Sequence, residues 1–192
     1  MPFAIPKIDT IYLDMDGVLV DDNDMFNRVA PTVGNMKEHI TKLKVFGQKQ
    51  AFIFPLIDEA IKRNLFEKAK KTQFGEVVSL LLLPYWKMLG INVEILSSTM
   101  KTNPLRKELE DQKIKWLKAH GFGHLKVNLV PGSAEKQVFA RAGALLIDDY
   151  DRTIGQFISQ GGYAIQYTNF KEVMHTLSLL NLCENITHGQ KG

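Results

Sequence analysis

Short apolar runs alternate with helical segments along most of the chain. Five runs have the length and apolar character of buried strands: residues 8–13, 93–96, 125–130, 144–147 and 163–167. Helical periodicity is found in residues 76–89, 105–119, 133–142, 151–160 and 170–180. Strands that alternate with helices indicate a parallel sheet with helices on both faces. We therefore predict an α/β fold with a Rossmann-like, doubly wound parallel sheet.

The segment after the first apolar run interrupts this alternation. Residues 21–74 contain no convincing strand and are rich in helix formers. We predict a core domain of residues 1–20 and 75–192, with a small helical cap inserted as residues 21–74. The cap lysines form either a solvated helix face or a positive wall that attracts an anionic substrate. They are the lysines at 37, 42, 44, 49, 62, 68, 70 and 71.

Polar residues follow the predicted strands at the points where these end. The ligand-binding edge of an open parallel sheet lies beyond the carboxyl ends of its strands, so these residues are expected to converge there. Carboxylates are costly to bury and repel one another unless a cation holds them. The residues are Asp14 and Asp16 after the first strand, Ser97 and Ser98 after the second, Lys136 after the third, and Asp148 and Asp149 after the fourth.

A magnesium ion would relieve the repulsion among these acids. Mg²⁺ prefers oxygen ligands and commonly binds carboxylates together with phosphate groups. The remaining phosphate oxygens would be held by serine, lysine and free backbone N–H groups. The sequence therefore predicts Mg²⁺ as cofactor and a phosphate ester as ligand.

Four motifs resemble those of the haloacid dehalogenase superfamily. They are DMDGV after an apolar strand, a serine that ends the second strand, a lysine at the start of a later helix, and IDD at the end of the fourth strand. Their order and spacing fit across nearly the whole chain. The resemblance implies phosphoryl transfer through an aspartyl-phosphate intermediate.

The resemblance also implies a role for each motif residue. Asp14 would be the nucleophile, and Asp16 the general acid that later activates water. The metal ligands would be Asp14, the backbone carbonyl of Asp16, Asp149 and, directly or through water, Asp148. The phosphate would contact Ser97, Ser98 and Lys136, and Lys101 is either a further phosphate contact or a solvated loop residue.

Within the superfamily the chain is most similar to the 5'(3')-deoxyribonucleotidases. The similarity lies in DMDGVLVD, the helical cap, ILSST, and the block QKIKWLKAHGF with Lys113 and Trp116. It implies a nucleoside monophosphate as substrate. Phe26 and Phe66 are candidate base-stacking residues, together with the other cap phenylalanines Phe46, Phe52 and Phe54. An equally open alternative is that these rings form the core of the cap.

Two further functions compete with the nucleotidase. One is a phosphatase for a sugar phosphate or another small metabolite on the same core. The other is a module that binds a phosphorylated ligand without turnover. A net charge of +3 is too small to indicate a stable nucleic-acid partner. A single cysteine fits a reducing, cytoplasmic compartment, and no apolar run is long enough to span a membrane. Oligomeric state is left open.

Overall fold

A computed structural model describes residues 7–31 and 46–183 of the chain. Its centre is a parallel sheet with the strand order β3-β2-β1-β4-β5. The strands are β1 (Thr10–Leu13), β2 (Asn92–Ser98), β3 (Lys126–Val130), β4 (Ala144–Asp148) and β5 (Tyr163–Gln166). All five predicted strands are present within a few residues of their expected ends. The α/β prediction is confirmed.

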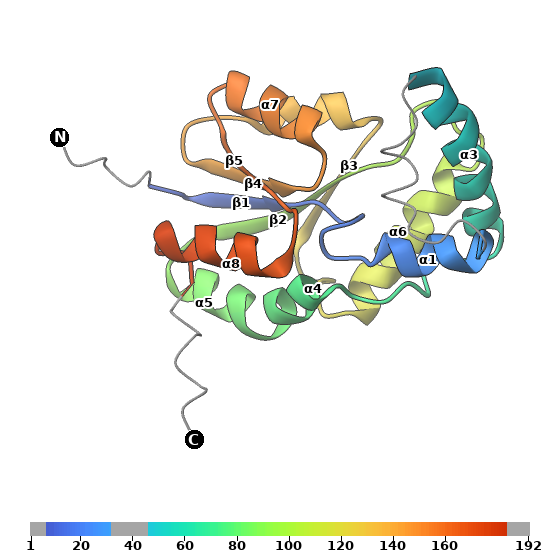
Figure 1. Ribbon diagram of the computed structural model, residues 1–192. Coiled ribbons are helices and arrows are strands. Elements are labelled where there is room, and N and C mark those ends of the chain that lie inside the picture. The colour runs from blue at the N-terminus through green and yellow to red at the C-terminus, as the bar shows by residue number, and fades with distance from the viewer. Residues whose placement is uncertain (1–6, 32–45, 184–192) are drawn as a thin grey trace.

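Helices cover both faces of this sheet (Figure 1). One face carries the continuous run of α4 (Gln73–Val77), the π-helical η1 (Val78–Leu82) and α5 (Leu83–Met88), together with α8 (Phe170–Leu179). The other face carries the 3-10 helix η2 (Ser133–Phe139) and α7 (Asp151–Ser159). Pro84, near the start of α5, lacks the N–H for an ordinary helical bond, and a π-turn directly before it accommodates this loss.

The central strand is buried on both faces. Ile11 and Leu13 are fully buried in the larger apolar cluster, whereas Tyr12 joins a smaller cluster with Phe157 of α7. Leu13 pairs with Ile95 of β2 on one side and with Ile147 of β4 on the other. β4 continues to Asp148 and β2 to Ser98 beyond these partners of Leu13, so the carboxyl ends of all three strands point to the same edge of the sheet.

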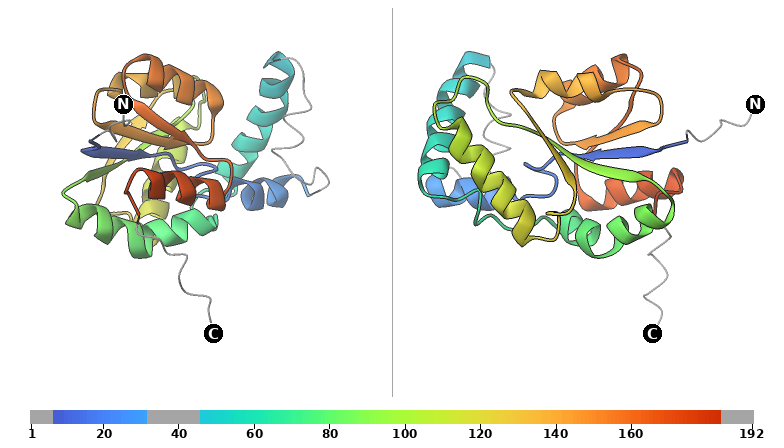
Figure 2. Two further views of the ribbon diagram at one scale, coloured as in Figure 1. Left: turned by 60° about the vertical axis from the view of Figure 1, so that its left-hand side comes forward. Right: turned by 180° about the vertical axis from the view of Figure 1, so that it is seen from behind.

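Three helices gather beyond that edge: α1 (Asp22–Val29), α3 (Phe46–Lys62) and α6 (Arg106–Ala119) (Figures 1 and 2). The described part of the predicted cap contains α1 and α3, and residues 32–45 lie outside the described residues. The domain boundaries at 21 and 74 stay a prediction. Within residues 7–31 and 46–183, no helix combines the length and apolar character that a bilayer crossing requires.

Candidate active site at the carboxyl edge of the sheet

The loop after β1 turns back on itself directly beyond Asp14. The Asp14 N–H donates to the Ile147 carbonyl at 3.0 Å, so this residue still follows the sheet register. The Met15 carbonyl then accepts from the N–H groups of Leu19 and Val20, each at 2.9 Å. This tight return projects the two aspartates of DMD from a fixed loop rather than from a continuing strand.

Gly17 permits a close approach between this loop and the end of β4. Its φ is +73°, in the left-handed region that side chains disfavour. A Cβ at this position would lie 2.5 Å from Oδ2 of Asp149. Only glycine therefore lets the Asp149 carboxylate lie against the loop that carries Asp14 and Asp16.

Lys136 joins two of the predicted site carboxylates. Its Nζ lies 2.9 Å from Oδ1 of Asp14 and 2.6 Å from Oδ2 of Asp148. All three side chains are buried. The Asp14 Oδ1 also accepts from the Met15 N–H at 2.7 Å, which fixes the orientation of that carboxylate. Two donors, the Lys136 ammonium and the Met15 N–H, therefore bind the same oxygen of Asp14.

The charges in this cluster shift one another's protonation. Burial alone would lower the pKa of Lys136, but the charges of Asp14 and Asp148 outweigh it and raise the pKa to about 12. Burial and the neighbouring charge of Asp14 raise the pKa of Asp148 to about 7, despite the ion pair with Lys136. The cluster therefore holds more negative charge than one lysine neutralises.

The acidic residues could hold a divalent cation. Carboxylate oxygens of Asp14, Asp148 and Asp149 lie within 4.8 Å of one another. A divalent cation bound among these carboxylates would reduce the repulsion between them, which the ammonium of Lys136 offsets only in part. Oxygen-only donors suit a hard cation such as Mg²⁺ or Ca²⁺. The chemistry of the donor set fits the expected metal.

The carboxylate of Asp16 lies outside this acidic group and faces a different lysine. Its Oδ2 accepts from Nζ of Lys113 at 2.5 Å. The same Nζ donates to Ser97 Oγ at 2.8 Å and to the Ser98 carbonyl at 3.0 Å. Ser97 is fully buried and Ser98 is half-buried. Lys113 of α6 therefore connects the end of β1 with the end of β2.

The other predicted residues are not brought to this cluster. Lys101 is exposed in the turn after β2, and within the described part of the chain no side chain pairs with it. Phe26 and Phe66 are buried in the apolar core, which favours packing for both rings. Base stacking by them stays a prediction. Phe52 is half-buried, Phe54 is 40% exposed on α3, and the side chain of Phe46 lies outside the described residues.

Sequence reasoning gave Lys113 no role in the site. The residue belongs to the QKIKWLKAHGF resemblance, which assigns it no contact. A stronger signal was present in the helical periodicity, because positions 109, 112, 113, 116 and 117 share one face of a helix. The structure buries all five, namely Leu109, Gln112, Lys113, Trp116 and Leu117. A lysine on an otherwise mainly apolar face needs a partner, and that requirement points to a site.

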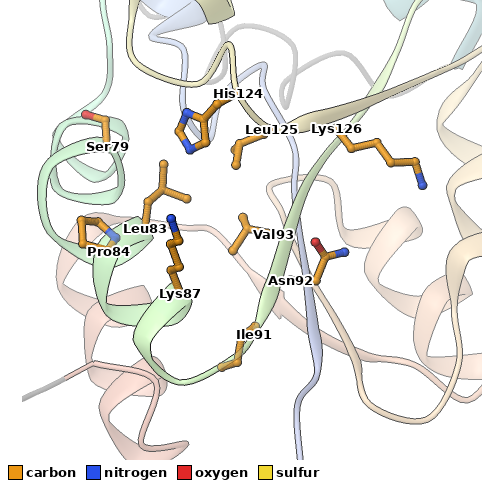
Figure 3. Close-up of a pocket in the computed structure, with 10 residues that line it drawn as sticks. All are labelled: Ser79, Leu83, Pro84, Lys87, Ile91, Asn92, Val93, His124, Leu125 and Lys126. Carbon is orange, nitrogen blue, oxygen red and sulfur yellow. The ribbon is translucent and has the colours of Figure 1, made fainter.

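A separate groove lies near the opposite edge of the sheet, at the start of β2 and β3. It has a volume of about 650 Å³. Figure 3 shows apolar side chains of α5 and β2 in it, with Lys87 and His124 beside them. Both of these polar side chains are exposed. The groove contains none of the predicted site residues.

No family model matches the sequence, and no curated protein matches it. Solved structures do resemble the fold. A haloacid dehalogenase-like family hydrolase from Streptococcus pneumoniae gives a TM-score of 0.54 at 14% identity, over 83% of this chain and 84% of the other. CbbY from Rhodobacter sphaeroides in complex with phosphate gives 0.53 at 13% identity, over 85% and 87%. L-2-haloacid dehalogenase from Xanthobacter autotrophicus gives 0.53 at 12% identity, over 91% and 83%.

These similarities agree with the motif order found in the sequence. They cover most of both chains, although few residues are identical. The specific resemblance to deoxyribonucleotidases is not shown by them and stays a prediction. The chain has the fold of the haloacid dehalogenase superfamily hydrolases.

Proposed function

We propose that the protein is a magnesium-dependent phosphomonoesterase that acts through an aspartyl-phosphate. The observation that carries this proposal is the buried Asp14 carboxylate, held 2.9 Å from Lys136 among further acids at the sheet edge. A carboxylate whose oxygen is fixed beside a cation is oriented for nucleophilic attack. The surplus negative charge of the cluster gives it a use for a divalent cation.

The proposed reaction has two steps. In the first, an oxygen of Asp14 attacks phosphorus, and the ester P–O bond breaks with its electron pair passing to the leaving oxygen. Asp16 donates the proton that this oxygen takes up. In the second, Asp16 accepts a proton from water as the water oxygen attacks phosphorus, releasing inorganic phosphate and the Asp14 carboxylate. Lys136 and the Ser97 hydroxyl stabilise the phosphoryl oxygens in both steps.

The metal would be held by carboxylates of Asp14, Asp148 and Asp149 and by the Asp16 backbone carbonyl. When bound, Mg²⁺ supplies positive charge against the phosphoryl oxygens and the nucleophile. The chain's own contribution is to hold these ligands together. Gly17 is central to this, because it lets Asp149 approach the loop after β1.

Carbon–halogen cleavage, the chemistry named for the Xanthobacter neighbour, fits the charges less well. A halide leaves without a proton, so it has no use for a second acid such as Asp16. A haloacid is itself an anion, and a cluster with a surplus of carboxylates would repel it unless cations were added. A phosphate ester needs a proton on its leaving oxygen, which Asp16 can supply. Its metal ion would be bound by the carboxylate cluster.

The substrate class is a finer proposal. The resemblance in DMDGVLVD, ILSST and QKIKWLKAHGF supports a nucleoside monophosphate, deoxy forms included. Phe54, exposed on α3, is the described cap ring best suited to stack on a base. A sugar phosphate would need a polar cap surface instead.

The test is phosphate release with Mg²⁺ from ribo- and deoxyribonucleoside monophosphates, sugar phosphates and a 2-haloacid. Asp14→Asn is the matched blank, because it keeps the size of the side chain and removes the nucleophile. We expect turnover on nucleotides, at least about 10³-fold lower in the variant. Turnover on sugar phosphates alone would rule out a nucleoside monophosphate as the substrate. Halide release without phosphate release would rule out phosphoryl transfer as the reaction. Full activity of Asp14→Asn would overturn the mechanism.

A further inference from the structure

Lys113 is buried, and each of the three N–H donors of its ammonium group has an acceptor. An ammonium has three N–H donors. In this structure they have three acceptors: Asp16 Oδ2 at 2.5 Å, Ser97 Oγ at 2.8 Å and the Ser98 carbonyl at 3.0 Å. The side chain itself is 1% exposed. Its position is therefore fixed by packing and by three directional bonds.

These bonds make the two oxygens of Asp16 different. Oδ2 is bound to Lys113, whereas Oδ1 is buried and has no hydrogen-bond partner in the described structure. An unsatisfied buried oxygen is unfavourable, and the leaving oxygen of an entering substrate would accept a hydrogen bond from a proton carried by Oδ1. Oδ1 is shielded from solvent although the Asp16 side chain as a whole is 35% exposed.

The same bond also orients Ser97. Its Oγ accepts from Lys113, so the hydroxyl proton is directed away from the lysine and is available to a phosphate oxygen. Packing on α6 does not require an ammonium at this position, although its removal leaves Asp16 Oδ2 and the Ser98 carbonyl without this donor. The neighbouring members of the buried α6 face include Leu109, Trp116 and Leu117, and an apolar side chain would pack among them.

We propose that Lys113 is a positioning residue that holds Asp16 by Oδ2 and thereby assigns proton transfer to Oδ1. This inference rests on the proposed phosphomonoesterase function. In the first step the Oδ1–H proton passes to the leaving oxygen as the P–O bond breaks. In the second step Oδ1 takes a proton from water. Lys113 takes no part in either proton transfer.

Leaving-group dependence tests this role. The Lys113→Met variant is compared with wild type on an alkyl phosphate, whose alkoxide needs a proton, and on para-nitrophenyl phosphate, whose phenolate leaves without one. The measured quantity is kcat/KM, which reports steps up to formation of the phosphoenzyme. We expect about a 10²-fold loss on the alkyl ester and only a few-fold loss on the aryl ester. An equal loss on both esters would overturn the positioning role.

Gln112 provides the matched control on the same buried helix face. Its Nε2 donates to the Ile61 carbonyl of α3 at 2.8 Å, whereas the lysine bound to Asp16 is its neighbour Lys113. Gln112→Leu should show no selective loss on the alkyl ester. The same selectivity in this variant would mean that any disturbance of α6 produces the effect, and would overturn the inference.

Two further variants distinguish a wrong role for Lys113 from a misfolded variant or a wrong proposed function. In an Asp16→Asn background, Lys113→Met should cause no additional loss on the alkyl ester, because Lys113 acts through Asp16. An additional loss as large as in wild type would contradict this. If Lys113→Met folds poorly, Lys113→Arg takes its place in the test. It keeps the positive charge and should therefore retain more activity on the alkyl ester than Lys113→Met. A folded Lys113→Arg protein without this activity would count against the proposal. Absence of Asp14-dependent turnover in wild type, by contrast, would reject the proposed function itself.

Discussion

The two ends of the parallel sheet differ in how they hold charge. At the carboxyl edge, Asp14, Lys136 and Asp148 are buried together and depend on one another for neutralisation. At the amino edge, a groove of about 650 Å³ is lined by both apolar and polar side chains, and its Lys87 is exposed to water. Water screens a solvated charge at little cost, whereas buried charges require partners. The comparison teaches that enforced proximity of buried charges, rather than the size of a hollow, indicates where chemistry occurs.

The same substitution at the two ends gives the largest expected contrast. Lys136→Met removes the cation between Asp14 and Asp148, and we expect kcat to fall about 10²–10³-fold. The protein should also lose about 3–5 kcal/mol of unfolding free energy, because two buried carboxylates are left facing each other. Steady-state kinetics and urea unfolding measure the two effects. Near-normal turnover in a folded Lys136→Met protein would remove the basis of the comparison.

Protonation of Asp148 gives a second contrast, in the metal-free protein. The pKa of Asp148 is raised from 3.8 to about 7 in the folded state, first by burial and then by Asp14. The folded state therefore binds this proton more tightly than the unfolded state, and stability falls as pH rises from about 4 through 7. Lys136, whose pKa is raised to about 12, titrates outside this window.

The measurement compares the melting temperatures of wild type and Asp148→Asn in a chelating buffer. Asparagine resembles the protonated acid and does not titrate, so the difference between the two proteins isolates Asp148. Relative to the variant, wild type should lose at least about 2–4 °C between pH 5 and pH 8, the shift that about 1 kcal/mol produces in a chain of this size. A difference that does not change with pH would contradict the raised pKa.

Gly17→Ala has a smaller predicted effect, and the chain contains a close control. Gly17 and Gly90 have φ angles of +73° and +72°, yet only at Gly17 would a Cβ meet Asp149, since nothing lies within 4 Å at Gly90. Gly90→Ala should cost about 1–2 kcal/mol for the left-handed backbone alone. Gly17→Ala should cost more and should weaken Mg²⁺ binding, measured by calorimetry. Equal costs with unchanged Mg²⁺ affinity would show that the approach of Asp149 is unimportant.

The smallest effect is expected at the groove. Lys87→Met changes an exposed side chain far from the predicted motifs, so kcat/KM should stay within about twofold and stability within about 0.5 kcal/mol. The assays are those used for Lys136→Met. A large loss of turnover in Lys87→Met would mean that the amino-edge groove takes part in function.

Much of the fold could be predicted because its strands are short, apolar and regularly spaced. The alternation of runs such as 93–96 and 144–147 with helical segments is a local signal, and parallel pairing follows from it. The meeting of Asp14, Lys136 and Asp148 was also predictable, since residues after parallel strands share an edge. What the pattern could not give was side-chain direction. Whether Asp16 faces the metal ligands or Lys113 depends on the turn at Gly17, which no periodicity describes.

The cap shows the opposite case. Phe26 and Phe66 were candidates for base stacking because aromatic rings serve both as stacking platforms and as core residues. Which role a ring takes depends on tertiary packing, and the structure buries both. Residue type alone carries no information on that choice.

The position of β1 in the sheet has a consequence for amide exchange. It is the middle strand, paired with β2 on one side and β4 on the other. Its amides should therefore exchange with deuterium mainly through global unfolding, whereas α1 and α3 should exchange through local openings. In states where only α1 and α3 open, the backbone that carries Asp14 would keep its place. The protein would then gain access for a substrate without loosening the strand that aims the nucleophile.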